Sequence, residues 1–462
     1  MGDVENKMKV AKFGGSSLAD AGQIKKVTDI MLTDSERRVM VVSAPGKRSD
    51  DDTKVTDLLI QLGEAYLKRG EAQQELEAVV ARYKSIADEL ELGEDIVSTI
   101  REDFNERLRY DSSHPGEYMD QMKAGGEDNN AKIIARYLQQ LGVSAQYMNP
   151  KEAGLLVSDD PGNAQVLAET FDHLYKLRER EEILIFPGFF GYAKSGRLVT
   201  FPRGGSDITG SIVAAGLQAS LYENFTDVDS VYAANPGVVE EPCEIKRMTY
   251  REMRELSYAG FGVFHDEALI PAFRKSIPVC VKNTNNPNAP GTMIIAEREH
   301  AENPIIGIAA DKGFSTVYVR KYLMNREIGF GRKLLTILED EDISYEHMPS
   351  GIDDTSVILD EGQLTPEKES RILQRIRTEL EVDDAHIEKG YAMIMLVGEG
   401  MHETVGIAGR AAAALSDNKI PIEMINQGSS EVSLSFGIYE EHVDHAICAL
   451  YEEFFSAKKV LQ

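Results

Sequence analysis

The chain opens with an alternation of apolar and polar segments that predicts a strand, a glycine turn, a helix and a second strand. Residues 8–13 form a short apolar strand pattern, and residues 14–17 (Gly-Gly-Ser-Ser) interrupt it. Helical periodicity follows over 21–32, and residues 39–43 are again a run of apolar strand formers. This order is typical of the start of an α/β domain.

The middle of the chain continues this pattern after a long helical excursion. From residue 56 to 110 the sequence is charged, nearly free of glycine and apolar at helical spacing, which predicts amphipathic helices. Beyond it strands and helices alternate, which predicts a mainly parallel sheet covered by helices on both faces. The expected elements are a helix over 128–141, strands over 143–148, 183–186 and 198–201, a helix over 207–217 and a strand over 220–226.

The last third of the chain changes character. An Asn- and Pro-rich loop at 283–292 and a charged stretch at 297–304 predict a domain boundary. The order β-α-β-β-α-β then fits residues 315–389, with one strand over 343–348, and it recurs from a strand at 391–397 onward. Two small split-βαβ sandwiches are predicted. The expected domains are residues 8–297, 298–389 and 390–462, with a last strand at 459–461 able to return to the middle domain.

Composition and charge narrow the class of protein. The 462 residues carry 77 acidic and 50 basic side chains, a net charge of −27, which disfavours a nucleic-acid or anionic-membrane binder. No apolar run approaches the roughly 20 residues of a bilayer span. Cys243, Cys280 and Cys448 lie far apart without a C-x-x-C pair, so neither a disulfide framework nor a metal site is expected, and a reducing cytoplasm fits.

The segment K-F-G-G-S-S (residues 12–17) is the first candidate for chemistry. Its glycines let backbone N–H groups approach a ligand after a strand, an arrangement that favours phosphate. Lys12 can stabilise the negative charge of a phosphoryl group in transfer. The motif is neither a Walker nor a Rossmann sequence, and a purely structural turn is the alternative interpretation.

A second glycine loop, F-P-R-G-G-S-D-I-T-G, covers residues 201–210. The planar guanidinium of Arg203 suits a carboxylate, which indicates an amino-acid substrate. Ser206 or Asp207 can cap the following helix, and a cap alone is the structural alternative for Asp207.

Two further segments are weaker candidates. The acidic stretch 226–236 ends a strand, where it could hold magnesium or ribose hydroxyls, and Tyr232 could cover a base, although such loops are usually only solvated. Glu117 follows Gly116, and a partly buried glutamate there could pair with a substrate ammonium.

Taken together and in order, seven motifs of the chain resemble aspartokinase. They are K-F-G-G-S-S, V-V-S-A-P-G-K, G-E-Y-M, F-P-R-G-G-S-D, F-T-D-V-D-S-V-Y-A-A-N-P, I-P-V-C-V-K-N-T and I-N-Q-G-S-S-E. The resemblance implies an α/β, three-layer αβα amino-acid-kinase fold followed by two ferredoxin-like βαββαβ ACT domains. It also implies a cytoplasmic enzyme that phosphorylates the L-aspartate side chain with ATP and Mg²⁺, the first step of lysine, threonine and methionine synthesis. The expected assembly is a homodimer or a dimer of dimers through ACT domains.

The resemblance also implies a role for each matching residue. Lys12 would stabilise the transferring phosphoryl group, and Asp207 would orient that lysine. L-aspartate would be held by Ser16, Glu117, Arg203 and Ser206. ATP would be contacted by Lys12, Gly14, Gly15, Ser16, Thr226, Asp227 and Tyr232. A carboxylate nucleophile needs no base, so positioning and charge neutralisation are enough for such a reaction.

Two departures from the family pattern each remove a positive charge. Gly262 stands where the family has a phosphate-contacting lysine, and residues 235–237 read Asn-Pro-Gly where the family has Asp-Pro-Arg. We hypothesise that Lys282 contributes to the triphosphate site instead, with Lys246 and Arg247 as alternatives.

The segment M-N-R-E-I-G-F resembles the effector loop of lysine-sensitive aspartokinases. The implied effector residues are Met324, Gly329, Phe330, Ser344, Glu346 and Ser350. Glu346 offers an anion for the side-chain ammonium of lysine, which threonine lacks, so we favour L-lysine as the inhibitor and keep L-threonine as the alternative. The structural alternative is that these residues only pack.

Two other functions stay open at this point. Another amino-acid kinase of the same fold, such as one acting on glutamate, is disfavoured by Glu117 and by the ACT pair. A catalytically silent amino-acid sensor is supported by the loss of lysine at Gly262. Against a decayed kinase stands the joint presence of Lys12, Glu117, Arg203 and Asp207.

Overall fold

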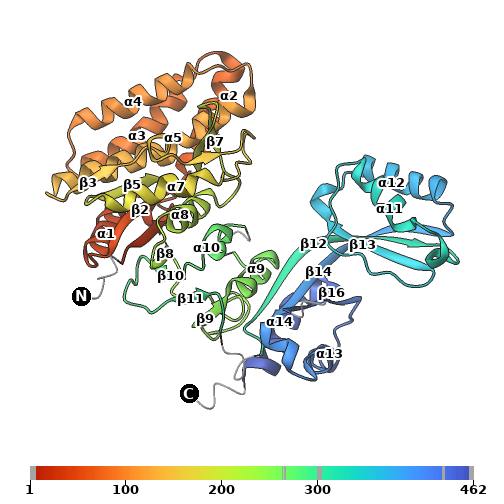
Figure 1. Ribbon diagram of the computed structural model, residues 1–462. Helices are drawn as coiled ribbons and strands as arrows, with labels where there is room; N and C mark the ends of the chain where they lie inside the picture. Colours follow the sequence, from red (N-terminus) through yellow and green to blue (C-terminus); the bar gives the residue numbers. More distant parts are fainter. Residues whose placement is uncertain (1–6, 263, 265–266, 299–303, 429–431, 457–462) are drawn as a thin grey trace. The chain divides into compact units, whose positions relative to one another are not determined.

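The computed structural model describes residues 7–262, 264, 267–298, 304–428 and 432–456, and the chain divides into two compact units (Figure 1). The first unit comprises residues 1–231, 244–253 and 263–298, and the second comprises residues 232–243, 254–262 and 299–462. Each unit has its own sheets and its own hydrophobic cluster.

An eight-stranded sheet forms the centre of the first unit, in the order β3-β5-β2-β1-β8-β10-β11-β9. All neighbouring strands are parallel except β10 and β11, which confirms the predicted mainly parallel sheet. The strands are β1 (Lys9–Phe13), β2 (Arg37–Val42), β3 (Ala145–Tyr147), β5 (Ile183–Pro187), β8 (Leu221–Thr226), β9 (Arg247–Thr249), β10 (Val279–Asn283) and β11 (Thr292–Ile295).

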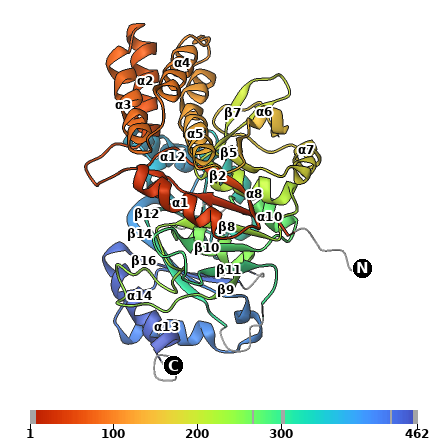
Figure 2. The same cartoon turned by 90° about the vertical axis from the view of Figure 1, so that its left-hand side faces the viewer.

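Helices cover both faces of this sheet and complete three layers (Figures 1 and 2). On one face α8 (Gly205–Gly216) packs with α7 (Glu169–Tyr175) and α10 (Ile270–Arg274). On the other face α1 (Ala21–Leu32) and α5 (Pro115–Gln140) share a buried cluster with the rings of β1 and β8. Successive side chains of a strand point to opposite faces, so each strand serves both layers.

The helical excursion is present as predicted. It consists of α2 (Val55–Arg69), α3 (Gln73–Glu89) and α4 (Glu94–Leu108), which pack with one another and with α5 (Figure 2). Helix α5 begins at Pro115, well before the expected start at residue 128. The helix continues through the glycine pair at 125–126. A Cβ at Gly126 would lie 2.8 Å from the Cβ of Ala44, so the absence of a side chain lets the helix approach the loop at Ala44 closely.

Three short strands form a separate small sheet in the first unit. They are β4 (Leu156–Val157), β6 (Phe190–Ala193) and β7 (Leu198–Thr200), in the order β4-β6-β7. The strand expected near residues 198–201 therefore exists but lies outside the main sheet. The short helix α6 (Pro150–Ala153) precedes β4, and α9 (Tyr250–Tyr258) begins in the first unit and ends in the second.

In its described residues the second unit contains one antiparallel sheet of five strands, and the α-helices α11 to α14 lie wholly within it. The sheet order is β13-β12-β14-β16-β15. The strands are β12 (Gly307–Arg320), β13 (Asp354–Asp360), β14 (Asp384–Val397), β15 (Met424–Gln427) and β16 (Ser433–Tyr439). The helices are α11 (Phe330–Glu339), α12 (Pro366–Glu379), α13 (Ile407–Asp417) and α14 (Val443–Tyr451).

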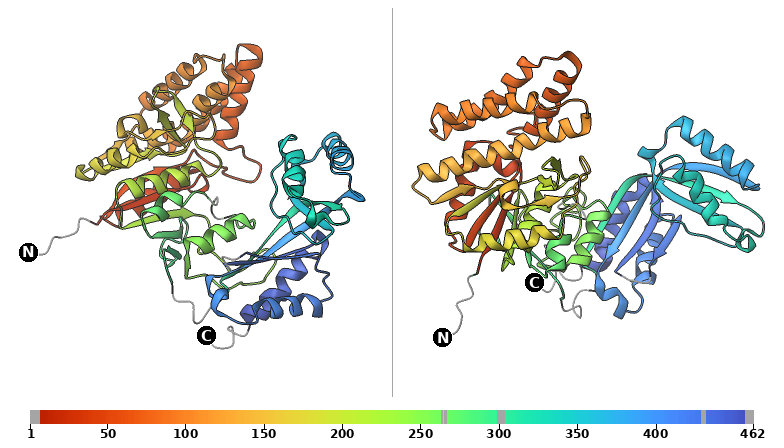
Figure 3. Two further views of the ribbon diagram at one scale, coloured as in Figure 1. Left: turned by 45° about the vertical axis from the view of Figure 1, so that its right-hand side comes forward. Right: turned by 45° about the horizontal axis from the view of Figure 1, so that its top comes forward.

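Two long strands run through both halves of this sheet, visible as the long teal and blue strands in Figure 3. The strands expected separately over 385–389 and 391–397 are thus one strand, β14, and the expected boundary at 389/390 falls inside it. Gly390 has φ 79° and Gly313 on the facing strand β12 has φ 90°, where the pairing register shifts. A bulge of this kind bends a strand without ending it, which the sequence pattern did not reveal.

Another expected strand is largely absent. Over residues 343–348 the structure shows a single bridge, between His347 and Ile358 of β13; the chain bends at residue 346, and the next bridge joins Ser350 to Thr355, so the pairing stays isolated and no strand forms. The last strand expected at 459–461 lies outside the described residues. None of the helices in the described ranges combines the length and apolar character that a membrane span needs.

Two segments that the sequence placed with the first domain pack with the second unit. The backbone N–H of Ile308 donates to the carbonyl of Ala233 at 2.7 Å, and the N–H of Cys243 donates to the Tyr451 hydroxyl at 2.8 Å. Ser433 Oγ donates to Glu255 at 2.8 Å. The domain limits drawn from the sequence remain a prediction.

Candidate active site

Lys12 and Asp207 form an ion pair at the carboxyl end of the central sheet. Lys12 is the penultimate residue of β1, and Asp207 lies in the first turn of α8. Lys12 Nζ lies 2.6 Å from Asp207 Oδ1, and the two side chains are only 8% and 18% exposed. A negative side chain at a helix N-terminus is also favoured by the helix dipole. The two residues predicted to carry the chemistry therefore lie in direct contact.

The first glycine turn lies beside this ion pair and is packed against a second loop. A Cβ at Gly14 would lie 3.6 Å from Lys12 Nζ, so the ammonium group is next to the turn. The N–H of Gly46 donates to the carbonyl of Gly15 at 2.8 Å, and a Cβ at Gly46 would lie 2.5 Å from the backbone of Gly15. Ser16 is exposed and begins a short 3-10 turn, so α1 does not start directly at the glycines.

The second glycine loop leads into α8. Gly204 has φ 79°, which allows the sharp turn before the helix, and Ser206 is buried in its first turn. Arg203 is exposed, and no ion pair is recorded for it within the described residues. A Cβ at Gly188 would lie 2.6 Å from Ser206 Oγ. Phe189, next to it, has φ 76° and was missed by the sequence reasoning; such backbone strain in a non-glycine residue clusters at functional sites.

Glu117, the expected ammonium ligand, already has a cation from the protein. It lies in the first turn of α5 and forms an ion pair with Arg197, which precedes β7. Arg197 also pairs with Asp159 at 2.9 Å. Neither Arg197 nor Asp159 was identified from the sequence.

A different glutamate on the same helix, Glu127, lies next to the glycine loops. Its carboxyl group is buried and accepts a hydrogen bond from the backbone N–H of Ala44, in the loop that packs on Gly15. Burial raises the pKa of Glu127 to about 8. Within the described residues its Oε2 is buried without a hydrogen-bond partner. Such an oxygen is an unused acceptor in a low-dielectric environment.

The sequence held a signal for this glutamate. After the Gly-Gly pair, residues 127–130 (Glu-Asp-Asn-Asn) are four consecutive polar residues in a helix, and all four are buried. Four consecutive residues of a helix point in all directions around its axis, so some of them face the interior. Polar side chains at all four positions therefore indicate hydrogen-bond partners inside the fold. Asn130 Nδ2, for example, donates to the carbonyl of Ser43 at 2.7 Å.

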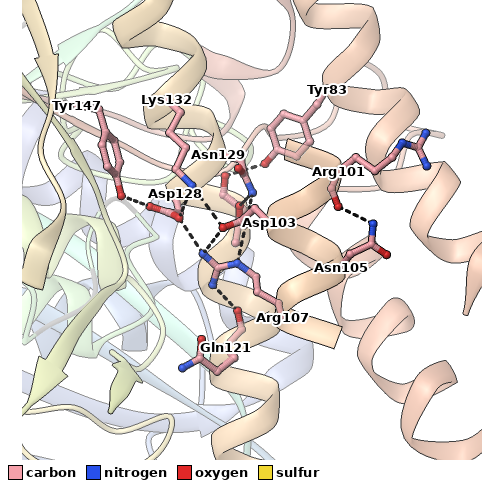
Figure 4. A network of polar contacts seen from close by, with 12 residues as sticks. Tyr83, Arg101, Asp103, Asn105, Arg107, Gln121, Asp128, Asn129, Lys132 and Tyr147 are labelled. Carbon is pink, nitrogen blue, oxygen red and sulfur yellow. Dashed lines mark hydrogen bonds and ion pairs between the residues drawn. The ribbon is translucent and has the colours of Figure 1, made fainter. Parts of the chain in front are cut away.

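An ion network next to Glu127 fixes α5 to its neighbours (Figure 4). Arg107 on α4 pairs with Asp128 and Asp103 at 2.7 Å each, and Lys132 pairs with Asp128 at 2.9 Å. The Tyr147 hydroxyl donates to Asp128 as well. Burial opposes ionisation of Asp103, but Arg107 and Lys132 together lower its pKa. Charges are thus balanced within the network, which supports a structural role in holding Glu127's helix.

The residues expected at the nucleotide follow β8. Thr226 is the last residue of β8, and its hydroxyl donates to Asp227 at 3.1 Å. Asp229 accepts from Asn283 Nδ2 at 2.7 Å, which ties this loop to the end of β10. Tyr232 belongs to the segment that packs with the second unit.

The residues proposed to replace the missing cations are not brought to Lys12. Lys282 is in register with Phe225, whereas Lys12 is in register with Asn224, so Lys282 and Lys12 leave opposite faces of the sheet. Arg247 lies on β9, the edge strand, and Lys246 precedes it; both are exposed.

The six expected effector residues all lie in the second unit, in two neighbouring segments. Met324 and Phe330 are buried in one hydrophobic cluster, against which Met348 of the other segment packs. Gly329 has φ 80° at the start of α11. The three polar members each have a partner: Ser344 with Gln363, Glu346 with the Tyr258 hydroxyl, and Ser350 with Thr355 at 3.0 Å.

Comparison with known proteins agrees with this architecture. Residues 7–283 match the amino acid kinase family, and residues 394–454 match an ACT domain. Aspartokinase 3 of Bacillus subtilis is 58% identical over 449 residues, which cover 97% of this chain and 99% of that protein. The crystal structure of Clostridium acetobutylicum aspartate kinase has a TM-score of 0.84 at 36% identity and covers 97% of this chain and 100% of that one.

A further solved structure, that of E. coli aspartokinase III in complex with aspartate and ADP, has a TM-score of 0.79 at 25% identity, with 97% and 100% of the two chains covered. The similarity thus extends over the catalytic and the regulatory parts alike, and the 58% identity to the Bacillus subtilis protein is high enough to show the family. The chain belongs to the aspartokinase family, whose members are ATP-dependent phosphotransferases with a carboxyl group as acceptor.

Proposed function

We propose that this chain transfers the γ-phosphoryl group of ATP to the side-chain carboxylate of L-aspartate, giving 4-phospho-L-aspartate, the entry step to lysine, threonine and methionine synthesis in the cytoplasm. The observation that carries the proposal is the buried Lys12–Asp207 ion pair beside the glycine turn at Gly14. The aspartate carboxylate is already a nucleophile, so the protein has to position it and neutralise the phosphoryl charge. Lys12 supplies that charge, and Asp207 holds the ammonium group in place.

The substrate site follows from the groups around that pair. Arg203 offers a guanidinium for the α-carboxylate of aspartate, and Ser206 lies three residues further along the chain. Ser16 would contribute from the first glycine turn. For the substrate ammonium we add Glu127 beside Glu117, since Glu127 has an unused oxygen whereas Glu117 is paired with Arg197.

The nucleotide would be held by Gly14, Gly15, Thr226, Asp227 and Tyr232. Mg²⁺ fits such a site as a partner of the nucleotide, since it keeps several waters and binds substrate phosphates. Within the described residues no cluster of three or more acidic, histidine or cysteine side chains could hold a metal, so no residue of the chain is assigned to the ion. When bound with ATP, Mg²⁺ would neutralise phosphate charge.

The second unit would regulate this activity in response to an amino acid, with L-lysine favoured over L-threonine. The carboxylate of Glu346 and the cluster around Met324 and Phe330 offer an anion and an apolar wall for a lysine side chain. The E. coli aspartokinase III relative has been solved with lysine bound. We also propose a catalytic domain at 8–297 and two ACT repeats at 298–389 and 390–462, which share one sheet through the continuous strands β12 and β14.

Assembly through the ACT region is supported by exposed apolar side chains around the effector loop. Tyr322 is 72% exposed, Ile328 97% and Ile352 68%. Large apolar side chains exposed together are typical of association surfaces. A homodimer, or a dimer of dimers, would cover them.

The test is to trap aspartyl phosphate with hydroxylamine in the presence of Mg-ATP and L-aspartate, with and without L-lysine. L-glutamate serves as the control substrate. We expect a product specific for aspartate that decreases with lysine. Product from glutamate would favour the other amino-acid kinase, and no product from either would favour a silent sensor.

A further inference from the structure

Asn224 touches the proposed catalytic ion pair from a neighbouring strand. It lies on β8 in register with Lys12 on β1, so both side chains leave the same face of the sheet. Asn224 Nδ2 donates to Asp207 Oδ1 at 2.6 Å, and Lys12 Nζ lies 2.6 Å from the same oxygen. One carboxylate oxygen thus accepts from the lysine and from the amide together.

Tyr222, two residues earlier on β8, holds the backbone of the same aspartate. Its hydroxyl donates to the carbonyl of Asp207 at 3.3 Å and lies 3.4 Å from Asn224 Nδ2. A Cβ at Gly210 would collide with this hydroxyl, so the glycine leaves room for the phenol under the first turns of α8. Burial raises the pKa of Tyr222 well above its usual value, so the hydroxyl stays protonated and able to donate.

Burying the polar groups of Asn224 and Tyr222 in a central strand costs free energy of folding unless they are hydrogen-bonded. Asn224 is 3% exposed and Tyr222 is fully buried, in a strand where an apolar β-branched residue would pack without any polar group to satisfy. Their hydrogen bonds converge on Asp207, which gives the polar pair a purpose beyond strand packing.

We propose that Asn224 is a positioning residue for phosphoryl transfer: its amide fixes the Asp207 carboxylate so that Asp207 in turn fixes the Lys12 ammonium, with Tyr222 supporting the same turn of α8. Two donors on one oxygen restrict rotation of the Asp207 carboxylate. With Lys12 as the only donor, the flexible lysine side chain and the carboxylate could shift together. The inference rests on the proposed function, since it acts through Lys12 and Asp207.

The test compares Asn224→Leu with the wild-type enzyme under the hydroxylamine assay. We expect kcat to fall about 10- to 100-fold, the loss associated with misplacing a catalytic group by roughly an ångström. The KM values for ATP and aspartate should change much less, because Asn224 contacts neither expected binding group. Tyr222→Phe should lower kcat by a smaller factor. Thr28→Val is the control: it changes a buried hydroxyl of α1, which covers the face of the sheet opposite to α8 and Asp207, so it should leave kcat unchanged.

A second variant separates positioning from a general packing defect. Asn224→Asp puts a second carboxylate against Asp207, and two adjacent carboxylates share a proton at low pH. A shared proton would replace the amide hydrogen bond, so the activity of Asn224→Asp relative to wild type should decrease as pH rises from 6 to 8. The ratio for Asn224→Leu should be constant over that range, and Asn224→Gln should recover part of kcat.

Each outcome decides a different point. Wild-type kcat in Asn224→Leu, or a pH-independent ratio in Asn224→Asp together with no recovery in Asn224→Gln, would overturn the positioning role. If Lys12→Ala retained full activity, the catalytic role of Lys12 would fail, whereas the absence of product from the wild-type enzyme would overturn the proposed function itself. If Lys12→Ala were inactive while Asn224→Leu behaved as wild type, only the present inference would be lost.

Discussion

The hydroxyl of Tyr258 donates a hydrogen bond to the carboxylate of Glu346, a residue 88 positions later in the chain. Glu346 is the anion that we propose for the ammonium of a lysine effector. The phenol occupies one oxygen of this carboxylate, Oε2, so a ligand ammonium that binds that oxygen competes with Tyr258. Tyr258 ends α9, four residues before Gly262, the position where the family pattern has a cation.

The first prediction concerns this competition. Tyr258→Phe removes the competing hydroxyl and keeps the ring, so lysine should inhibit at about a tenfold lower concentration, the value of one hydrogen bond to a charged group. The measurement is the lysine concentration that halves the rate. Glu346→Gln should weaken lysine inhibition, and Tyr345→Phe, an exposed phenol next to the site, serves as the control. Unchanged sensitivity in Tyr258→Phe would show that the phenol does not compete.

The second prediction distinguishes the two glutamates of α5. Glu127→Gln should raise the KM for L-aspartate at least tenfold, because the substrate ammonium lowers the pKa of Glu127 and pairs with the ionised carboxylate, which the variant lacks. Glu117→Gln should have a smaller effect on that KM, because Glu117 is bound to Arg197. The KM for ATP is the internal control in both variants. The opposite ranking of the two glutamates would return the ammonium site to Glu117.

The third prediction concerns pH. Burial raises the pKa of Glu127 to about 8, above the ordinary value of 4.5. Between these two pH values the folded protein keeps a proton on Glu127 that the unfolded chain has already lost. This group therefore favours the folded state below pH 4.5 and progressively loses that contribution up to pH 8. Glu127→Gln does not titrate, so its melting temperature relative to wild type should increase between pH 5 and pH 8. A pH-independent difference between the two proteins would contradict the raised pKa.

The fourth prediction concerns the missing cation. A Cβ at Gly262 would have no atom within 4 Å, so the backbone leaves room for a side chain to begin there in Gly262→Lys. The added charge should lower the KM for ATP by roughly three- to tenfold, since anionic ligands gain about 1 kcal/mol or more from a nearby cation. Gly262→Met, of similar length without charge, is the control.

A companion variant tests whether Lys282 already supplies that charge. Because Lys282 leaves the sheet on the face opposite to Lys12, Lys282→Ala should change the KM for ATP by less than about threefold. A tenfold increase would establish Lys282 at the triphosphate in place of the family lysine.

Local patterns predicted most of the fold, because parallel strands and amphipathic helices have strong periodicities. The pairing of Lys12 with Asp207 came from the resemblance to aspartokinase, because the local pattern alone indicated only two glycine loops of the same kind, one after Lys12 and one before Asp207. Glu127 was missed because its helix was expected to begin only at residue 128, and its partners come from a loop over 80 residues away in the sequence. Asn224 was missed because a single polar residue in a strand can be given a role only when its neighbour on the adjacent strand, here Lys12, is known.

The continuity of β12 and β14 has a consequence for dissecting the protein. Residues 307–312 of β12 pair with residues 392–397 of β14, so a chain ended at the sequence-derived boundary of 389 would leave that part of β12 without its neighbour. An uncovered strand edge pairs readily with other chains. A fragment cut there would aggregate rather than fold as a separate regulatory module, and the useful unit for expression is the whole sheet.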